Sequence, residues 1–258
     1  MTPRSEPENG AAARRSPTDG PPAALCVVVP AYNEARRLGR TLARIRDYMA
    51  AGGVPCEVIV ADDGSRDGTP EVVTGFDAAP LCVRLIQNPR NRGKGYAVRQ
   101  GVLVSTGALV LMSDADLSAP IEEVEKLRPW LERGYDIVIG SRDLPESVLD
   151  PPQPRLRRWM AWTFRGLRRR LLLPELRDTQ CGFKLFRGDV ARRAFALCSA
   201  DGWLFDCEVL AIAQRLGYRV KEVGVVWRND PDSRVRPLRE ALRAVPTLWR
   251  IRRRVARL

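Results

Sequence analysis

Short apolar runs alternate with longer stretches of helical spacing along most of the chain. The apolar runs read as strands and occupy 25–30, 56–61, 81–87, 108–113 and 136–140. The helical stretches between them occupy about 34–51, 95–104 and 121–131. Strands and helices that alternate with short connections are typical of a mostly parallel, doubly wound sheet. The pattern therefore predicts a Rossmann-like α/β fold with helices on both faces of the sheet.

The two ends of the chain differ from this central region. Residues 1–24 are rich in Pro, Gly, Ser and charged side chains and have no apolar period, which predicts a disordered tail. Residues 25–236 are predicted to form one α/β domain, and 237–258 a basic amphipathic helix. No apolar run approaches the roughly 20 residues that a membrane-spanning helix needs, so we expect no span.

Two arginine-rich stretches carry an apolar face at helical spacing. In the first, apolar positions are Leu156, Trp159, Met160, Thr163, Phe164, Leu167 and Leu171, and the arginines elsewhere on the wheel are Arg157, Arg158, Arg165, Arg168 and Arg169. In the second, the apolar positions are Leu242, Val245, Trp249 and Val255, and Pro246 is expected to kink the helix. Such helices suit the surface of an anionic membrane. The alternative is that each apolar stripe packs against the domain.

Charge and composition narrow the function classes. The formal net charge of +12 favours anionic partners, either nucleic acid, phosphorylated substrates or an acidic membrane surface. RNA-binding aromatic motifs, helix-turn-helix spacing and zinc-ligand spacing are missing, so we expect no nucleic-acid partner. The chain has no histidine, which excludes a histidine base, a Ser-His-Asp triad and a histidine-ligated metal. Six scattered cysteines without CxxC spacing predict buried thiols in a reducing compartment.

The segment LMSDADLSAP at 111–120 places two aspartates at the end of an apolar run. Side chains two apart in an extended segment point the same way, so Asp114 and Asp116 are expected to project from one face and to need a nearby cation. A hard divalent ion such as Mg²⁺ or Mn²⁺ prefers such oxygen ligands, often completed by substrate phosphates. The alternative is an acidic loop that caps the next helix, with Ser118 as N-cap and Pro120 in the first turn.

Polar motifs follow four of the predicted strands. AYNE follows the first strand, DDGS the second, DAD the fourth and GSR the fifth. Because ligands of doubly wound sheets bind at the carboxyl ends of the strands, the four motifs are expected to converge on one edge. The sequence therefore predicts a ligand site there.

The motifs VVVPAYNE, DDGSRDGT, NRGKGYAVRQG, DADLS, GSR and DTQCGFKLF follow the order and approximate spacing of family 2 glycosyltransferases of the GT-A fold. The chain resembles that family from about Leu25 to Arg236. The later motifs DTQCGFKLF, GWLFDCEVL and SRVR are most similar to those of dolichyl-phosphate β-glucosyltransferases and their polyprenyl-phosphate relatives, with the mannose synthases next. The resemblance implies a GT-A domain that binds a nucleotide-sugar donor.

The resemblance also implies roles for individual residues on the donor side. Pro30, Tyr32 and Glu34 match the segment that holds the base and ribose, and Asp62 and Asp63 match an acidic pair that contacts the nucleoside.

The DxD segment Asp114, Ala115 and Asp116 is implied to carry the metal ion and the diphosphate. Lys94 is either a donor contact or an exposed side chain in a glycine-rich turn. Ser118 lies near the metal, where mannose synthases often have glutamine.

On the acceptor side, Arg142 and Lys184 match segments that face the acceptor phosphate, while Arg234 and Arg236 match a flexible basic loop that closes over the diphosphate. We expect the catalytic set to be Asp114, Asp116, Arg142 and Arg234. Asp178, Asp206 and Glu208 are expected in buried polar roles, and Trp203 and Phe205 in the core.

These observations predict an inverting, metal-dependent enzyme that transfers glucose from UDP-glucose to a polyprenyl phosphate. It is expected to lie peripherally on the cytoplasmic face of a membrane. A phosphate monoester is largely a dianion at neutral pH and can attack without a general base, which suits a chain without histidine. Ser118, together with Cys181 where mannose synthases tend to have serine, favours glucose. Transfer from GDP-mannose, or to a hydroxyl acceptor with Asp or Glu as base, remains the alternative.

Overall fold

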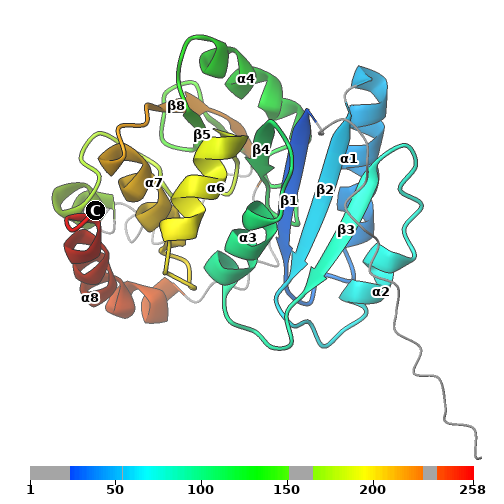
Figure 1. The fold of residues 1–258 in the computed structure, drawn as a ribbon, viewed down its shortest axis with the longest axis horizontal. Helices are drawn as coiled ribbons and strands as arrows, with labels where there is room; N and C mark the ends of the chain where they lie inside the picture. The colour runs from blue at the N-terminus through cyan, green and yellow to red at the C-terminus, as the bar shows by residue number, and fades with distance from the viewer. Residues whose placement is uncertain (1–23, 54, 151–164, 229–236) are drawn as a thin grey trace, which may run out of the picture.

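The computed structural model describes residues 24–53, 55–150, 165–228 and 237–258. A seven-stranded sheet forms its centre, in the order β3-β2-β1-β4-β7-β5-β8 (Figure 1). Its strands are β1 (Leu25–Ala31), β2 (Cys56–Asp62), β3 (Cys82–Gln87), β4 (Leu109–Met112), β5 (Ile137–Ser141), β7 (Lys184–Arg187) and β8 (Val220–Gly224). Two short strands, β6 (Val148–Asp150) and β9 (Val226–Arg228), pair with each other. All pairs in the large sheet are parallel except the two that involve β7.

The inner strands are buried on both faces. β1 and β2 are buried along their whole length, and Val28 lies opposite Ile59 in the parallel register. Their runs of Val and Ile suit this position, because β-branched side chains pack well on a pleated surface that is covered on both sides. The apolar runs of the sequence thus become the buried centre of the sheet.

Helices cover both faces of this sheet, which confirms the predicted α/β class. On one face lie α3 (Lys94–Leu103), α6 (Gly188–Leu197) and α7 (Phe205–Arg215), and α8 (Pro237–Val255) packs against α7. On the other lie α1 (Leu38–Gly52), α2 (Thr69–Thr74) and α4 (Val124–Glu132), the last preceded by the 3₁₀ helix η1 (Ile121–Glu123). Val28 of β1 packs under the first group, and Val27 under the second. Figure 1 shows α3 and α6 on the near side of the sheet and α1 on the far side.

The first helix begins later than the sequence predicts. The expected start was residue 34, whereas α1 begins at Leu38. Residues 34–37 instead form a turn, in which the Glu34 carbonyl accepts hydrogen bonds from the backbone N–H groups of Arg37 and Leu38. Asn33 before it has a left-handed backbone with a φ of 57°. This turn keeps the residues after β1 at the edge of the sheet instead of in the helix.

The two basic stretches are only partly described, and their predicted membrane faces are not confirmed. Residues 165–171 are helical, and Leu167 and Leu171 pack against the core. Arg168, predicted on the polar side, is buried and donates to the Arg177 carbonyl at 2.7 Å. Positions 156–164 lie outside the described residues. In this part of the chain the stripe packs on the domain.

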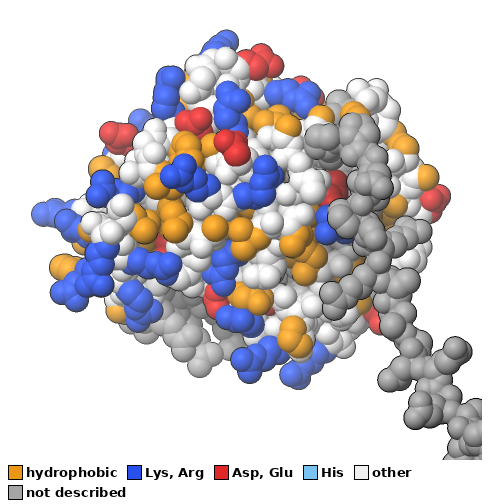
Figure 2. Space-filling model, in the orientation of Figure 1, with side chains coloured by type: hydrophobic (Ala, Val, Ile, Leu, Met, Phe, Trp, Pro, Cys, Tyr) orange, Lys and Arg blue, Asp and Glu red, His pale blue; other side chains and the backbone are white. Residues whose placement is uncertain are grey.

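In α8 the predicted apolar face is divided. Leu248, Ile251 and Val255 are buried, whereas Val245 and Trp249 are exposed. The helix also continues through Pro246. Figure 2 shows Lys and Arg side chains gathered at the lower left of the molecule, over α8. Within the described residues, none of the helices combines the length and apolar character that crossing a bilayer requires.

All six cysteines carry free thiols. Five are buried, as predicted, but Cys82 is exposed. The reason is that Cys82 lies on β3, the outermost strand on its side of the sheet, whose residues are exposed or half-buried.

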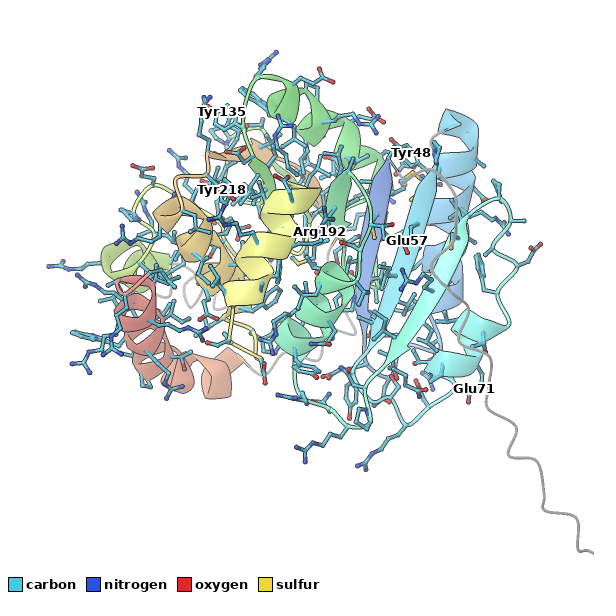
Figure 3. The ribbon with its side chains drawn as sticks, viewed as in Figure 1. Tyr48, Glu57, Glu71, Tyr135, Arg192 and Tyr218 are labelled. Carbon is cyan, nitrogen blue, oxygen red and sulfur yellow. The ribbon has the colours of Figure 1, made fainter. Side chains whose placement is uncertain are left out.

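Some charged side chains outside the ligand edge serve the fold. Figure 3 shows Arg192 on α6, beside β4. Its guanidinium donates to the carbonyls of Ser105 and Gly107 at 3.3 and 3.2 Å and so fixes the turn between α3 and β4. Glu57 on β2 accepts a hydrogen bond from Arg84 at 2.5 Å. Both contacts hold the segments that lead toward the ligand edge.

Candidate active site

The two aspartates of the DxD segment lie just beyond the end of β4, at the carboxyl edge of the parallel strands. Their side chains are 23% and 20% exposed, so both can be reached by a ligand. The Asp114 carbonyl accepts from the Leu117 N–H at 3.1 Å, which closes a turn with a φ of 47° at Leu117. This turn presents Asp114 and Asp116 at the same edge.

The backbone around the two acids is anchored to three elements. The Ala115 carbonyl accepts from the Thr41 hydroxyl of α1 at 2.6 Å. The Ser118 carbonyl accepts from the Arg228 N–H of β9 at 2.6 Å. The Ser113 N–H donates to the Val28 carbonyl of β1 at 3.0 Å. The position of the carboxylates is therefore set by the fold and needs no ligand to form.

Asp114 is paired with a cation. Its carboxylate accepts from Lys94 Nζ at 2.5 Å. Burial alone would raise the pKa of Asp114, but the Lys94, Lys184 and Arg142 charges outweigh it and lower that pKa. Burial would lower the pKa of Lys94, yet Asp114 and Asp206 raise it. Both groups are therefore charged at neutral pH.

Gly182 lies directly against this carboxylate. A Cβ at residue 182 would overlap the Asp114 side chain, so a glycine is needed where the chain passes into β7.

Asp116 is held differently. Its Oδ1 accepts from the Ser118 N–H at 2.9 Å, and its Oδ2 lies 3.9 Å from the Arg37 guanidinium. Burial, followed by the neighbouring Asp114 charge, raises the pKa of Asp116. An added positive charge at this position would thus be favoured.

The DxD carboxylates fit a divalent ion in their donor chemistry, since both offer hard oxygen ligands at one edge. In 24–53, 55–150, 165–228 and 237–258 there is no group of three or more His, Cys, Asp and Glu side chains that could hold a metal ion by themselves. Asp114 and Asp116 would therefore share the ion with ligand oxygens, as Mg²⁺ commonly does with phosphates.

The capping alternative for this segment is wrong. The helix after the DxD begins at Ile121, its N-cap position is Pro120, and no side chain caps it. Ser118 instead donates its N–H back to Asp116.

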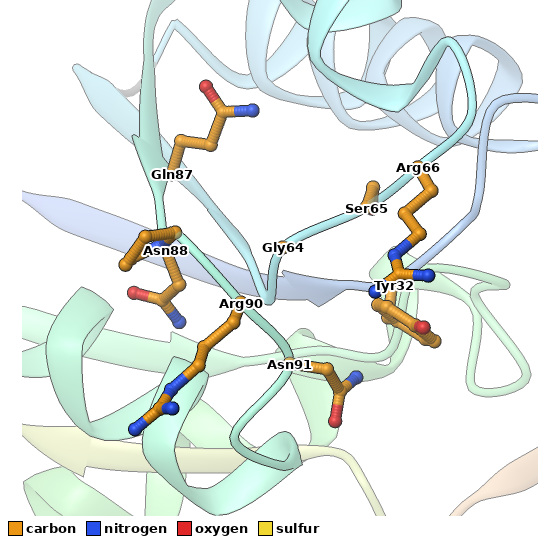
Figure 4. Close-up of a pocket in the computed structure, with 9 residues that line it drawn as sticks. Tyr32, Gly64, Ser65, Arg66, Gln87, Asn88, Arg90 and Asn91 are labelled. Carbon is orange, nitrogen blue, oxygen red and sulfur yellow. The ribbon is translucent and has the colours of Figure 1, made fainter.

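A pocket of about 350 Å³ lies at the carboxyl ends of β2 and β3 (Figure 4). Backbone and polar side chains dominate its lining, which is formed by Tyr32, Gly64, Ser65, Arg66, Gln87, Asn88, Pro89, Arg90 and Asn91. The Tyr32 ring is 37% exposed. Amide, guanidinium and phenol groups around an open cavity of this size can bind a nucleoside.

The other residues assigned to the nucleoside support this pocket from behind. Asp63 is buried and accepts from the N–H groups of Arg92 and Gly93 at 2.9 and 2.7 Å. Asp62, also buried, accepts from the Ser65 N–H at 3.2 Å.

Pro30 lies within β1, and the Glu34 carboxylate pairs with Arg37. The structure thus places Tyr32 in the pocket wall and the acids beneath the loops that form it.

Beyond β4, Arg142 follows the end of β5. Its guanidinium makes a two-point ion pair with Asp178, at 2.7 and 2.9 Å, and lies 4.8 Å from the ring of Trp227. Burial would raise the pKa of Asp178, but Arg142 holds it well below the usual range. The sequence predicts a buried polar role for Asp178 without identifying this partner.

Lys184 is placed deeper than the sequence predicts. Its side chain is fully buried, and Nζ lies 2.5 Å from Asp206 Oδ1 of α7. Lys184 therefore lies behind the DxD and faces Asp206 instead of an acceptor phosphate. Arg234 and Arg236 lie outside the described residues.

Sequence reasoning missed Trp203. It was expected in the core together with Phe205, but Trp203 is 40% exposed whereas Phe205 is fully buried. The ring of Trp203 lies 5.1 Å from Lys94 Nζ. The short motif GWLF carries no periodicity that distinguishes the two, so only the fold reveals that an aromatic ring faces the site.

The chain is similar to known glycosyltransferases in sequence and in fold. The sequence model of the family Glycosyl transferase family 2 matches residues 26–195. The chain is 36% identical to a dolichyl-phosphate beta-glucosyltransferase of Dictyostelium discoideum over 240 residues, covering 88% of this chain and 73% of the relative. It is 36% identical to the Homo sapiens protein of that name over 233 residues, covering 85% and 72%.

Among solved structures, the fold is similar to glucosyl-3-phosphoglycerate synthase of Mycobacterium tuberculosis in complex with Mn²⁺ and UDP-glucose. The TM-score is 0.63, at 20% identity, with 89% of this chain and 80% of the synthase covered. This likeness concerns the fold, which is that of GT-A glycosyltransferases. The family match over most of the sheet shows that the chain is a glycosyltransferase and belongs to glycosyl transferase family 2.

Proposed function

We propose that the protein transfers glucose from UDP-glucose to a polyprenyl phosphate such as dolichyl phosphate, with inversion at the anomeric carbon. One observation carries this proposal: in the sheet order, Asp114 and Asp116 lie between a pocket of nucleoside size and the Arg142 guanidinium. The relatives named dolichyl-phosphate beta-glucosyltransferase support glucose as the sugar and dolichyl phosphate as the acceptor.

In this proposal the donor lies along the carboxyl edge of the sheet. The nucleoside occupies the pocket beside Tyr32, and the diphosphate lies at the DxD. Mg²⁺ or Mn²⁺ held by Asp114 and Asp116 would supply positive charge for the leaving diphosphate, as the Mn²⁺ complex of the mycobacterial synthase suggests. Lys94 keeps Asp114 ionised and oriented. The assignment of Arg234 and Arg236 to the diphosphate remains a prediction.

The acceptor is proposed to be a phosphate because the acids next to the site already have cationic partners. Asp178 is buried and paired with Arg142, and Asp206 is buried and paired with Lys184, so neither is exposed to an acceptor hydroxyl. A phosphate dianion needs no such base. An oxygen of the acceptor phosphate forms a bond to the anomeric carbon from the side opposite the diphosphate. The bond from that carbon to the diphosphate breaks, and UDP leaves.

A lipid acceptor requires contact with a membrane, and α8 supports a peripheral contact. Trp249 is 48% exposed, and the Arg253 guanidinium lies 5.5 Å from its ring. Arg252 and Arg254 lie in the same last turn. Aromatic and basic side chains together favour the headgroup region of an anionic bilayer. The free thiols support the reducing, cytoplasmic side.

The direct test is transfer from labelled donors. Purified protein is incubated with UDP-glucose or GDP-mannose, a divalent ion and a polyprenyl phosphate, and the lipid extract is counted. We expect a labelled lipid with UDP-glucose and competition by UDP but not by GDP. Absence of lipid-extractable product with every donor would overturn the proposal. Full activity in excess chelator would contradict the metal assignment alone.

A further inference from the structure

An exposed tryptophan lies beside the catalytic acids without serving the core. Trp203 belongs to the segment 198–204, here termed the α6–α7 loop, which connects the two helices. Its ring is 40% exposed and lies 5.1 Å from Lys94 Nζ, which is itself 2.5 Å from Asp114. A single exposed aromatic side chain is common on a protein surface, so what distinguishes Trp203 is its position next to Lys94 at the candidate site.

The α6–α7 loop is fixed firmly by Glu208 of α7. The buried Glu208 carboxylate accepts from the Ser199 N–H at 2.8 Å, from the Ser199 hydroxyl at 2.9 Å and from the Ala200 N–H at 2.6 Å. Three hydrogen bonds to one buried charge hold the first half of the loop to the helix that follows it.

A second anchor ties the loop to α3 and the segment before it. Asp201 pairs with Arg92 at 3.1 Å and with Arg99 at 2.7 Å. The loop backbone also packs against Gly93 and Gly95, where a Cβ would overlap the carbonyls of Asp201 and Ala200. Trp203 is therefore exposed on a segment that two anchors hold in place.

The location of Trp203 complements that of the nucleoside pocket. The pocket lies at the ends of β2 and β3, whereas Trp203 precedes α7, whose Asp206 is bonded to Lys184 of β7. β4, which leads to the DxD, lies between β1 and β7 in the sheet. A donor with its nucleoside in the pocket and its diphosphate at the DxD would extend its hexose toward the α7 side.

We propose that Trp203 forms the wall of a subsite for the transferred hexosyl group. The apolar C–H face of the sugar packs on the exposed part of the indole ring, and Lys94, whose ammonium group lies over that ring, binds a sugar hydroxyl. This assignment rests on the proposed function and adds to it the residue that would distinguish the sugar nucleotide from the free nucleotide. An aromatic face with polar groups at its edge is a usual way to orient a small polar ligand.

The test compares the affinities for UDP-glucose and UDP, measured by titration calorimetry with Mn²⁺ present. In Trp203→Ala we expect UDP-glucose to bind about three- to tenfold more weakly, the range of one aromatic contact, and UDP to bind as in the wild type. Trp203→Phe should retain most of the affinity because it keeps a flat apolar ring. Leu103→Ala, which truncates an apolar side chain of the same 40% exposure on α3, serves as the matched control and should change neither affinity.

The alternatives give different results. An unchanged ratio of the two affinities in Trp203→Ala would overturn the subsite. A higher KM for the lipid phosphate with unchanged UDP-glucose affinity would assign Trp203 to the acceptor, which also overturns it. If the wild type binds UDP-glucose and transfers glucose while the variant behaves the same, the subsite alone fails. If the wild type binds neither nucleotide, the proposed function fails with it.

Discussion

The acids on the two sides of the DxD are satisfied by different kinds of donor. On the nucleoside side, Asp62 and Asp63 accept from backbone N–H groups of the loops above them. On the far side, Asp178 pairs with Arg142 and Asp206 with Lys184. Neutral donors leave the carboxylate charge in place, whereas a cation cancels it.

The pKa values of Asp62 and Asp178 show this difference, whereas burial keeps the pKa of Asp206 raised in spite of Lys184. Burial raises the pKa of Asp62, and the Ser65 hydrogen bonds only partly offset it. Burial acts on Asp178 as well, but Arg142 reverses the effect and lowers its pKa. The pocket side thus holds carboxylates that accept from neutral donors, and the far side holds carboxylates that are paired with cations.

The largest expected effect concerns the DxD, where the two sides meet. Asp116→Asn keeps the size of the side chain but removes its charge, so a divalent ion and the diphosphate lose a partner. We expect turnover to fall by at least about a hundredfold, with an unchanged thermal midpoint. Transfer of labelled glucose measures the activity. Asp47→Asn, an exposed acid on α1, should stay at wild-type turnover, and a similar loss there would point to a general charge effect.

The next prediction breaks a pair on the far side. Lys184→Met leaves Asp206 buried without its cation, which should lower the free energy of unfolding by about 3–5 kcal/mol. Urea unfolding measures it. Lys184→Met combined with Asp206→Leu removes both charges and should recover much of the loss. A double variant as unstable as the single one would show that packing, not charge, sets the effect.

A pH series sharpens the same comparison. The pKa of Asp178 is lower in the folded state than the usual value near 3.9. The ion pair of Asp178 with Arg142 therefore stabilises the folded state fully above about pH 4, and this stabilisation is lost as the pH falls further. We expect the stability of the wild type to decline below about pH 4. Arg142→Met combined with Asp178→Leu should decline less steeply over that range. Equal slopes in urea unfolding from pH 5 to 2.5 would contradict the role of this pair.

The smallest effect is expected on the nucleoside side. Asp63→Asn keeps one acceptor oxygen, so its side chain cannot accept from the N–H groups of both Arg92 and Gly93. The lost hydrogen bond should lower the free energy of unfolding by about 1–3 kcal/mol. The loop that forms the pocket wall would loosen, so UDP should bind more weakly. Calorimetry and urea unfolding measure the two effects. Asn88→Ala, which removes only a side-chain donor to Asp63, should change less.

The elements with strong local signals could be predicted from the sequence. Buried strands β1, β2 and β4 are continuous apolar runs, and the polar motifs after them meet at one edge because parallel strands must bring them there. Tyr32, Asp114 and Asp116 were placed at that edge on this ground, and the structure puts them there.

What depends on distant partners could not be predicted. The direction of β7, four residues long, is set by its neighbours and not by its composition. Lys184 was expected to face the acceptor phosphate; its burial against Asp206 could not be predicted because that partner lies on another element. Trp203 faces the ligand edge because Glu208 and Asp201 fix its loop, and no periodicity in the sequence reports such anchors.

The reversed direction of β7 has one further consequence. A strand parallel to β4 would reach the ligand edge with its last residues, but β7 reaches it with its first, so the turn Cys181–Gly182 crosses the Asp114 carboxylate before the strand descends into the core. Two residues later, Lys184 projects into the interior and bonds to α7. A shift of α7 would therefore reach the Asp114 carboxylate through residues 182–184, which links the helix behind the loop of Trp203 to an acid that is proposed to hold the metal ion.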